Sequence, residues 1–164
     1  MTPRSAEIAG GGIAGLSIAW ALARYGWRVR VHERGADIRE IGAGIFLMNN
    51  SLSIFEHYGI ASLILRRAVR LRATERRERD GSLIQRRTLP DGDRWLVLPR
   101  SDLVLGLAEA ARREGVEIVT NSAVARIDPD GSLRLESGEE KRADLVIGAV
   151  MVTVGAVVSG GFQV

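Results

Sequence analysis

Residues 5–33, SAEIAGGGIAGLSIAWALARYGWRVRVHE, decide the fold of this 164-residue chain. Residues 5–9 form a short, mostly apolar run that ends at three consecutive glycines, and residues 14–24 carry apolar side chains at helical spacing. Residues 28–33 then alternate valine with polar side chains, which is typical of a strand. The stretch therefore predicts a strand, a glycine turn, a helix and a second strand, which together form a βαβ unit with parallel strands and a right-handed crossover.

Three glycines of this turn have the spacing of a dinucleotide-binding motif. Gly10, Gly12 and Gly15 fit G-x-G-x-x-G, in which the glycines permit a tight turn, close approach of a pyrophosphate, and packing of the helix on the strand. Glu33 ends the next strand, where a carboxylate accepts hydrogen bonds from ribose hydroxyls and repels a 2′-phosphate. A dinucleotide other than NADP is therefore favoured, although the neighbouring Arg34 can pair with such a phosphate. A turn whose glycines serve only packing is the structural alternative.

The rest of the chain predicts further strands and helices packed on this unit. In order, these are a glycine-containing loop at 41–45, helical segments between 51 and 65, a β-hairpin at 69–88 with its turn at 79–82, a helix capped by Ser101 or Asp102 and ending at Gly115, a strand at 116–120, a second hairpin at 124–136 and an apolar strand at 143–149. The polar flanks of the first hairpin predict a sheet with one solvent-exposed face. We expect the strands at 5–9, 28–33, 116–120 and 143–149 to be parallel.

The composition excludes several classes of function. The chain is 46% hydrophobic and 26% charged, which is typical of a globular domain and not of a disordered one. It contains no cysteine, so disulfides, thiolate metal sites and cysteine nucleophiles are excluded, and with only His32 and His57 we expect no metal site. The net charge of +3 comes almost entirely from arginine and is weak evidence for nucleic acid, which we do not expect as a partner. Because the first residues lack the pattern of a signal peptide, we expect a cytoplasmic protein.

Residues 145–164 contain no charged residue, and an uncharged apolar stretch of about 18 residues or more is a candidate membrane span. However, this stretch is rich in β-branched residues and contains Ser159, Gly160 and Gly161, a composition that favours buried strands over a lipid-facing helix. We therefore expect no membrane partner. The exposed sheet edge and the apolar tail instead predict self-association of the chain.

Four segments match the motifs of a known family in order and spacing. They are IAGGGIAGLSIAWALARYGWRVRVHERG at 8–35, IGAGIFLMNNSLSIFEHYGI at 41–60, LPRSDLVLGLAEAA at 98–111 and ADLVIGA at 143–149. Together they resemble the N-terminal FAD-binding part of the FAD-dependent aromatic monooxygenases related to para-hydroxybenzoate hydroxylase, the class A flavoprotein monooxygenases. The resemblance implies an α/β, Rossmann-like FAD-binding fold of the glutathione-reductase-like type, with a parallel sheet and inserted β-hairpins. It also implies FAD as cofactor, NADH or NADPH as reductant, and a small aromatic substrate.

The resemblance implies binding residues for the adenosine half of FAD. The pyrophosphate would lie on the backbone of Gly10, Gly12, Ile13, Ala14 and Gly15. Glu33 would bind the adenosine ribose, Arg34 would lie by the adenine, and Val124 would meet the adenine through its main chain. On sequence grounds alone, however, Val124 is more typical of a core residue than of a contact.

The same resemblance implies residues for the flavin half. Gly42 and Gly44 would lie near the flavin ring or the ribityl chain, and Arg100 would contact the ribityl or phosphate region. The alternatives are that the two glycines are ordinary loop residues and that Arg100 only caps or flanks its helix. His57 and Trp95 are expected to be packing residues. No catalytic side chain is implied, because in this family the cofactor supplies the reactive oxygen.

The resemblance stops at Ala149, where the family strand continues into an Asp-Gly motif. The sequence thus predicts an FAD-binding domain at 1–149 that is incomplete relative to the family, and an apolar tail at 150–164 that does not match it. A change of reading frame or an altered terminus would produce such a break, and a natural variant with its own last strand is the alternative. We expect this chain to be the FAD-binding portion of such a monooxygenase, without full catalytic turnover of its own. The alternatives are a stand-alone dinucleotide-binding module and a non-functional truncated product.

Overall fold

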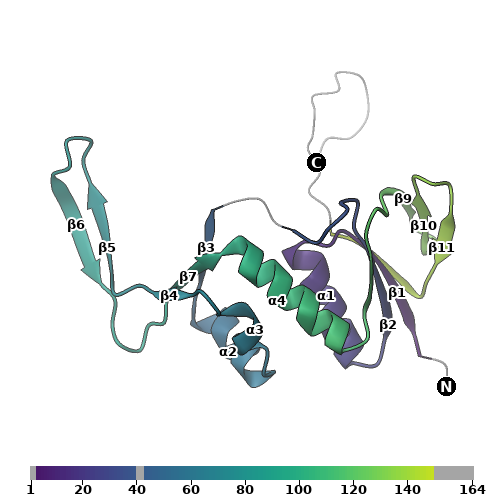
Figure 1. Ribbon diagram of the computed structural model, residues 1–164, viewed down its shortest axis with the longest axis horizontal. Helices are drawn as coiled ribbons and strands as arrows, with labels where there is room; N and C mark the ends of the chain where they lie inside the picture. Colours follow the sequence, from purple (N-terminus) through teal and green to yellow (C-terminus); the bar gives the residue numbers. More distant parts are fainter. Residues whose placement is uncertain (1–2, 40–42, 150–164) are drawn as a thin grey trace.

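The computed structural model describes residues 3–39 and 43–149, which form several small sheets and four helices (Figure 1). In chain order the elements are β1 (Ser5–Ala9), α1 (Ile13–Arg24), β2 (Arg28–His32), β3 (Gly44–Leu47), α2 (Asn49–His57), α3 (Ala61–Ile64), β4 (Val69–Arg70), β5 (Ala73–Arg77), β6 (Leu83–Thr88), β7 (Leu96–Pro99), α4 (Arg100–Arg113), β8 (Glu117–Val119), β9 (Val124–Asp128), β10 (Ser132–Leu135), β11 (Glu140–Arg142) and β12 (Leu145–Gly148). The predicted segment at 150–164 lies outside the described residues.

A four-stranded parallel sheet forms the centre of the molecule, in the order β12-β1-β2-β8. Strand β1 pairs in parallel with both β2 and β12, and β2 pairs in parallel with β8. The four strands expected to be parallel therefore lie in one parallel sheet, which confirms that prediction. The α/β fold with inserted antiparallel hairpins is confirmed as well.

Helices α1 and α4 cover one face of this sheet and lie side by side (Figure 1). The side chains that alternate along β1 and β2 toward this face are apolar, and they join the main core together with residues of both helices. The fully or almost fully buried members from these four elements are Ala6, Ile8, Leu16, Ala19, Val29, Val31, Leu103, Val104, Leu107, Ala108, Ala110 and Ala111. Alternation with a period of two thus assigns one face of β1 and β2 to the helices.

A small antiparallel sheet, in the order β11-β10-β9, lies on the opposite face of the parallel sheet. Leu133 and Leu135 of β10 pack against Ala9, together with Val124 and Val146. The hairpin predicted at 124–136 is confirmed as β9 and β10, while the third strand, β11, was not predicted from the sequence. Both faces of β1 and β2 are therefore covered by other layers.

The middle of the chain departs from the sequence prediction in two ways. The expected loop at 41–45 passes into strand β3 at Gly44, and β3 pairs with β7. Residues 69–70 form β4, which also pairs with β7 and is not part of the predicted hairpin. The hairpin is shorter, because only β5 and β6 pair with each other. These differences arise because β7 brings its own backbone donors and acceptors to both neighbours, a pairing that the local sequence does not reveal.

The β5–β6 hairpin projects away from the rest of the described structure (Figure 1). Its turn closes through a backbone hydrogen bond from Glu78 to Ser82 of 2.9 Å, close to the predicted turn at 79–82. Every residue of β6 and all but Ala73 of β5 are exposed. The prediction of one covered face is therefore wrong for the described residues.

Helix α4 begins two or three residues earlier than predicted. Pro99 is its N-cap residue, so neither Ser101 nor Asp102 caps it, and both lie in the first turn. The Asp102 carboxylate instead accepts a hydrogen bond of 2.8 Å from Nε of Arg67. The predicted end is confirmed, because Gly115 has a φ of 84°, in the left-handed region that favours glycine after a helix.

Candidate nucleotide-binding site

The glycine turn lies at the point of the parallel sheet where ligands bind in α/β folds. It follows the carboxyl end of β1, and the neighbours of β1 diverge there, with β2 and β8 on one side and β12 on the other. In open parallel sheets such a reversal of strand order leaves a crevice at the carboxyl ends of the strands. The sequence motif and the sheet topology therefore indicate the same location.

Gly10 and Gly15 are required by the turn itself. Gly10 has a φ of 106°, and its N–H donates a hydrogen bond of 2.8 Å to the carbonyl oxygen of His32. A Cβ atom at Gly15 would lie 1.9 Å from the carbonyl oxygen of Gly10, which is too close for any side chain. These two glycines allow the tight turn and the close packing of α1 on β1, as the motif predicts.

Gly12 has a different environment. Its φ of −83° and ψ of −172° are accessible to any residue, and a Cβ atom built there would have nothing within 4 Å. Neither backbone conformation nor protein packing therefore requires glycine at this position. Open space at the N-terminus of a helix is what the approach of a ligand would need.

The first turn of α1 offers backbone amides to an anion. The first intrahelical hydrogen bond runs from the N–H of Leu16 to the carbonyl of Gly12. No side chain caps the helix and its first turn has no acidic residue. The amides of Ile13, Ala14 and Gly15 precede that first bond, so they have no partner within the helix and lie at the positive end of its dipole. This arrangement fits a diphosphate.

Glu33 lies beside the turn and is held by two backbone amides. Its Oε2 accepts a hydrogen bond of 2.8 Å from the N–H of Gly11, and its Oε1 accepts one of 2.8 Å from the N–H of Gly35. Each carboxylate oxygen can accept a second hydrogen bond, so the group can still bind ribose hydroxyls. Gly11 was not singled out from the sequence, because its role depends on the approach of a side chain 22 positions away.

The other two residues predicted to contact the adenosine half are Val124 and Arg34, and the structure places them in different surroundings. Val124 begins β9 and packs in the small core that contains Ala9, the residue immediately before the glycine turn. Arg34 is exposed and follows Glu33 directly. Val124 is thus partly buried against this small core, at the start of β9.

The predicted flavin contacts form a second group. Gly44 pairs with Pro99 in the β3–β7 ladder, and the N–H of Arg100 donates a hydrogen bond of 3.4 Å to the carbonyl of Ala43. The structure therefore brings Gly44 and Arg100 together although they are far apart in the sequence. This group belongs to a different sheet from the glycine turn. Gly42 lies outside the described residues.

A buried polar network on the face of β1 and β2 opposite the helices was not predicted. His32 lies between Glu7 and Ser122, with 2.8 Å from its Nε2 to Oε2 of Glu7 and 2.7 Å from its Nδ1 to Oγ of Ser122. Arg30 reaches Glu7 at 3.3 Å, and its hydrogen bond with Glu117 raises the pKa of the guanidinium. The alternation in 28–33 marks one face of this strand as polar, but the sequence does not reveal the second sheet that packs against that face.

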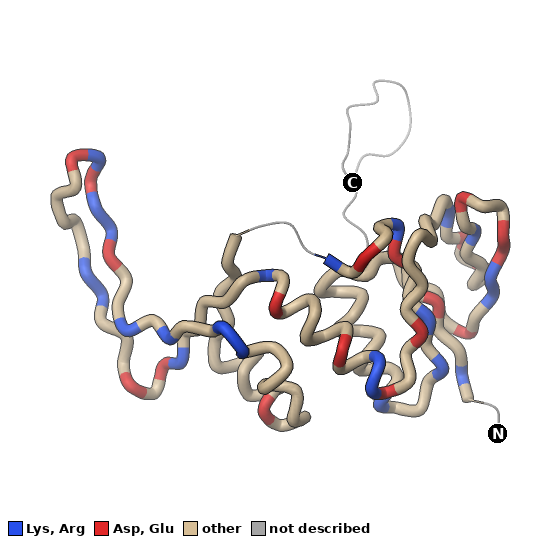
Figure 2. Tube along the Cα trace, in the orientation of Figure 1, with Lys and Arg blue, Asp and Glu red and all other residues tan. Residues whose placement is uncertain are grey.

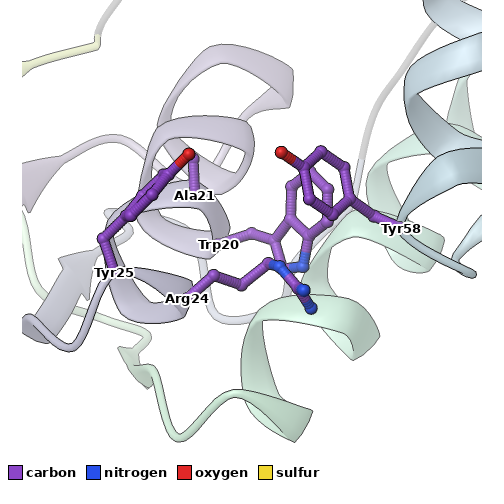
Figure 3. A pocket seen from close by; sticks show the side chains of 5 residues that line it. All are labelled: Trp20, Ala21, Arg24, Tyr25 and Tyr58. Carbon is purple, nitrogen blue, oxygen red and sulfur yellow. The ribbon is translucent and has the colours of Figure 1, made fainter.

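A surface pocket lies near the other end of α1. It is lined by Trp20, Ala21, Arg24, Tyr25 and Tyr58 (Figure 3). The guanidinium of Arg24 lies 4.8 Å from the ring centroid of Tyr58, and the rings of Trp20 and Tyr58 meet edge to face. Because these residues lie in the second half of α1, directly after α1 and directly after α2, the pocket is separate from the glycine turn. His57 packs its ring against Tyr58.

In the ranges 3–39 and 43–149, no three histidine, aspartate or glutamate side chains are grouped so that they could hold a metal ion. None of the helices in those ranges is both long enough and apolar enough to cross a bilayer.

The fold and the glycine turn together define a dinucleotide-binding α/β protein, and comparison with known proteins identifies its family. The model of the FAD binding domain family matches residues 5–149. The chain therefore belongs to the FAD binding domain family, as the sequence motifs predicted.

Several known proteins are similar to this chain over most of its length. The chain is 40% identical over 151 residues to 2-heptyl-3-hydroxy-4(1H)-quinolone synthase of Mycobacteroides abscessus, covering 91% of this chain and 40% of that protein. It is 37% identical over 155 residues to 3-hydroxybenzoate 6-hydroxylase of Polaromonas naphthalenivorans, covering 87% of this chain and 38% of that protein. Among solved structures, the tetrameric form of 2-methyl-3-hydroxypyridine-5-carboxylic acid oxygenase matches with a TM-score of 0.82 and 38% identity, covering 89% and 39%. The chain spans about two fifths of the length of these relatives.

Proposed function

We propose that this chain binds FAD as the FAD-binding portion of an FAD-dependent aromatic monooxygenase. The observation that carries the proposal is the open position at Gly12, at the uncapped N-terminus of α1 and next to the carboxylate of Glu33. A protein without a ligand here would gain helix stability from a polar or acidic N-cap side chain, which this turn lacks. The membership of the chain in the FAD binding domain family supports FAD as the dinucleotide.

The residues of the turn would bind the adenosine diphosphate half of FAD. The amides of Ile13, Ala14 and Gly15 would bind the pyrophosphate, and Glu33 would accept hydrogen bonds from the ribose hydroxyls. Arg34 would lie by the adenine and Val124 would meet it through its main chain. Gly42, Gly44 and Arg100 would lie along the ribityl and flavin half.

The substrate and the reductant are also part of the proposal. We expect a small aromatic substrate, because the relatives include a hydroxylase named for 3-hydroxybenzoate. When bound, the flavin supplies the activation of oxygen for insertion into the ring, with NADH or NADPH as the source of electrons. The chain's own contribution would be to bind and orient the cofactor, and we propose that residues 1–149 are the domain that does so. The absence of cysteine is compatible with a reducing cytoplasm, where we place the protein.

Substitution of Gly12 by valine tests this proposal. Since a Cβ atom at Gly12 contacts nothing within 4 Å, the variant should keep the helical circular dichroism of the parent. It should nevertheless lose at least about tenfold in affinity for FAD, because the side chain occupies the approach to the helix amides. Quenching of flavin fluorescence by the purified chain measures this affinity. FMN, which lacks the adenosine half, should bind more weakly than FAD.

Gly92 provides a matched control, because a Cβ atom built there also has nothing within 4 Å and its φ is not in the left-handed region. Gly92→Val should leave FAD binding unchanged. The proposal is wrong if Gly12→Val binds FAD as tightly as the parent, or if the parent shows no preference for FAD over FMN.

A further inference from the structure

The network of Glu7, His32 and Ser122 is buried between the parallel sheet and the small antiparallel sheet. The three residues are 8%, 2% and 7% exposed, respectively. They come from β1, from β2 and from the segment after β8, so the network joins three distant parts of the chain. Burial of polar side chains is costly unless they are hydrogen-bonded, and each of the three has a partner here.

The network continues through the backbone to Glu33. The N–H of Ser122 donates a hydrogen bond of 2.9 Å to the carbonyl of Glu33, and the N–H of Asn121 donates one of 2.9 Å to the carbonyl of Gly35. The N–H of Gly35 in turn holds Oε1 of Glu33 at 2.8 Å. Residues 121–122 thus support the segment 33–35, which orients the carboxylate beside the glycine turn.

The backbone of this supporting segment has an unusual conformation at Asn121, which the surrounding contacts must hold in place. Asn121 has a φ of 50° and is the only residue other than glycine with a positive φ among the described residues. A left-handed conformation at a non-glycine residue persists when the surrounding contacts determine it. The hydrogen bond between Ser122 and His32 is such a contact, because it ties the next residue to a buried ring of β2.

The serine hydroxyl suits this task because it can act both as donor and as acceptor. With a neutral imidazole whose Nε2–H faces Glu7, the hydroxyl of Ser122 donates to Nδ1, and with a charged imidazole it accepts from Nδ1–H. The contact between β2 and residue 122 is therefore kept in either state. An acid, a histidine and a serine in a row also occur in hydrolases, but the nucleophile there must reach a substrate, and Ser122 is buried.

We propose that Glu7, His32 and Ser122 are positioning residues for the adenosine half of the dinucleotide site, which act on the ribose hydroxyls through Glu33. This inference rests on the proposed function. Its specific consequence is that the network contributes to recognition of the hydroxyl groups of the ribose and not to binding of the diphosphate. Val124 lies two residues after Ser122, so the same anchor also sets the start of β9.

A comparison of two ligands separates this role from a general contribution to folding. ADP carries both ribose hydroxyls, whereas 2′,3′-dideoxy-ADP keeps the adenine and the diphosphate but lacks the groups that Glu33 would bind. Calorimetry with the whole chain should show that Ser122→Ala binds ADP about five- to tenfold more weakly than the parent, as expected for a loosened charge-assisted hydrogen bond. Its affinity for 2′,3′-dideoxy-ADP should equal that of the parent. Ser122→Thr keeps a hydroxyl and should restore most of the affinity for ADP.

Ser132 provides the matched control. It is also a buried serine whose hydroxyl bonds a side chain, Asp130 at 2.7 Å, but it lies in the antiparallel sheet. Ser132→Ala should bind both ligands as the parent does.

Glu7→Gln is a second test variant that is expected to fold, because glutamine has the size of glutamate and keeps an acceptor for His32. It should reduce the affinity for ADP by about twofold, again without an effect on the dideoxy ligand.

The outcomes distinguish this inference from the proposed function. A parent chain that binds neither ligand contradicts the proposed function and this inference with it. If the parent binds ADP but Ser122→Ala and Glu7→Gln weaken both ligands equally, or weaken neither, the positioning role is wrong and the proposed function stands.

Discussion

The β1–α1–β2 unit and the β5–β6 hairpin contain pairs of strands of similar length, yet they are stabilised in different ways. Strands β1 and β2 lie between helices on one face and a second sheet on the other, so even the polar side chains of Glu7 and His32 are buried. The hairpin has no layer on either face within the described structure (Figure 1). The comparison shows that alternation along a strand predicts two faces but does not say what covers each of them.

Charge distinguishes the two regions as well. The hairpin carries basic and acidic residues along much of its length (Figure 2). Its ion pairs, such as Arg77 with Glu75 at 2.7 Å, are between solvent-accessible groups and are worth little. In the unit, by contrast, Glu7 and His32 interact in a buried setting where electrostatic interactions are screened less.

The largest effect is expected at the turn of the unit. Gly15→Ala should destabilise the chain by about 3 kcal/mol or more, because the added methyl group would lie 1.9 Å from the carbonyl oxygen of Gly10 and the backbone must move. Urea denaturation followed by circular dichroism measures the free energy of unfolding. Gly12→Ala, three residues earlier, should cost at most about 1 kcal/mol. Similar losses for both variants would contradict the assignment of one glycine to packing and the other to ligand approach.

An intermediate effect is expected between the two regions, where Arg67 precedes β4 and Asp102 lies in the first turn of α4. The hydrogen bond from Arg67 lowers the pKa of the Asp102 carboxyl group. A carboxylate with a lowered folded-state pKa contributes stability that is present above its unfolded pKa of about 3.9 and is lost as the pH falls through the folded value. Asp102→Asn should therefore destabilise the chain by about 0.5 kcal/mol at pH 7, since Arg67 is largely exposed.

The pH dependence of this variant provides its control. The difference in unfolding free energy between the parent and Asp102→Asn should shrink as the pH falls below about 4, because the carboxyl group of the parent becomes protonated and is then as neutral as asparagine. A difference that stays constant from pH 7 to pH 3 would show that the carboxylate charge is not what stabilises this contact.

The smallest effect is expected in the hairpin. Leu83→Thr should change the free energy of unfolding by less than about 0.5 kcal/mol, because Leu83 is 50% exposed and threonine suits a strand. Ile8→Thr, at a fully buried position of β1, is the matched comparison and should cost about 2 kcal/mol or more. Equal costs at the two positions would mean that the hairpin is covered by another part of the protein or by a second copy.

Local sequence was sufficient for the elements whose signals are short-range. The glycine spacing, the helix after it and the alternating valines predicted the βαβ unit, because turn geometry and side-chain period act within a few residues. The same holds for the glycine at the end of α4 and for the turn of the β5–β6 hairpin. Since the motif places Glu33 at the end of a strand, the position of the acidic residue beside the turn could also be predicted from the sequence.

Tertiary structure alone decided the contacts between residues far apart in the chain. The sequence determined that Glu7, Arg30 and His32 alternate with apolar neighbours, but only the packing of β9–β11 on that face buries Glu7 and His32 and brings Ser122 to the imidazole. The sequence likewise pointed to Gly44 as a candidate contact, but only the pairing of β3 with β7 brings Gly44 next to Pro99 and Arg100. The physical reason is the same in both cases: a side-chain pattern specifies which face of a strand is distinct, whereas burial depends on the layer that packs against that face.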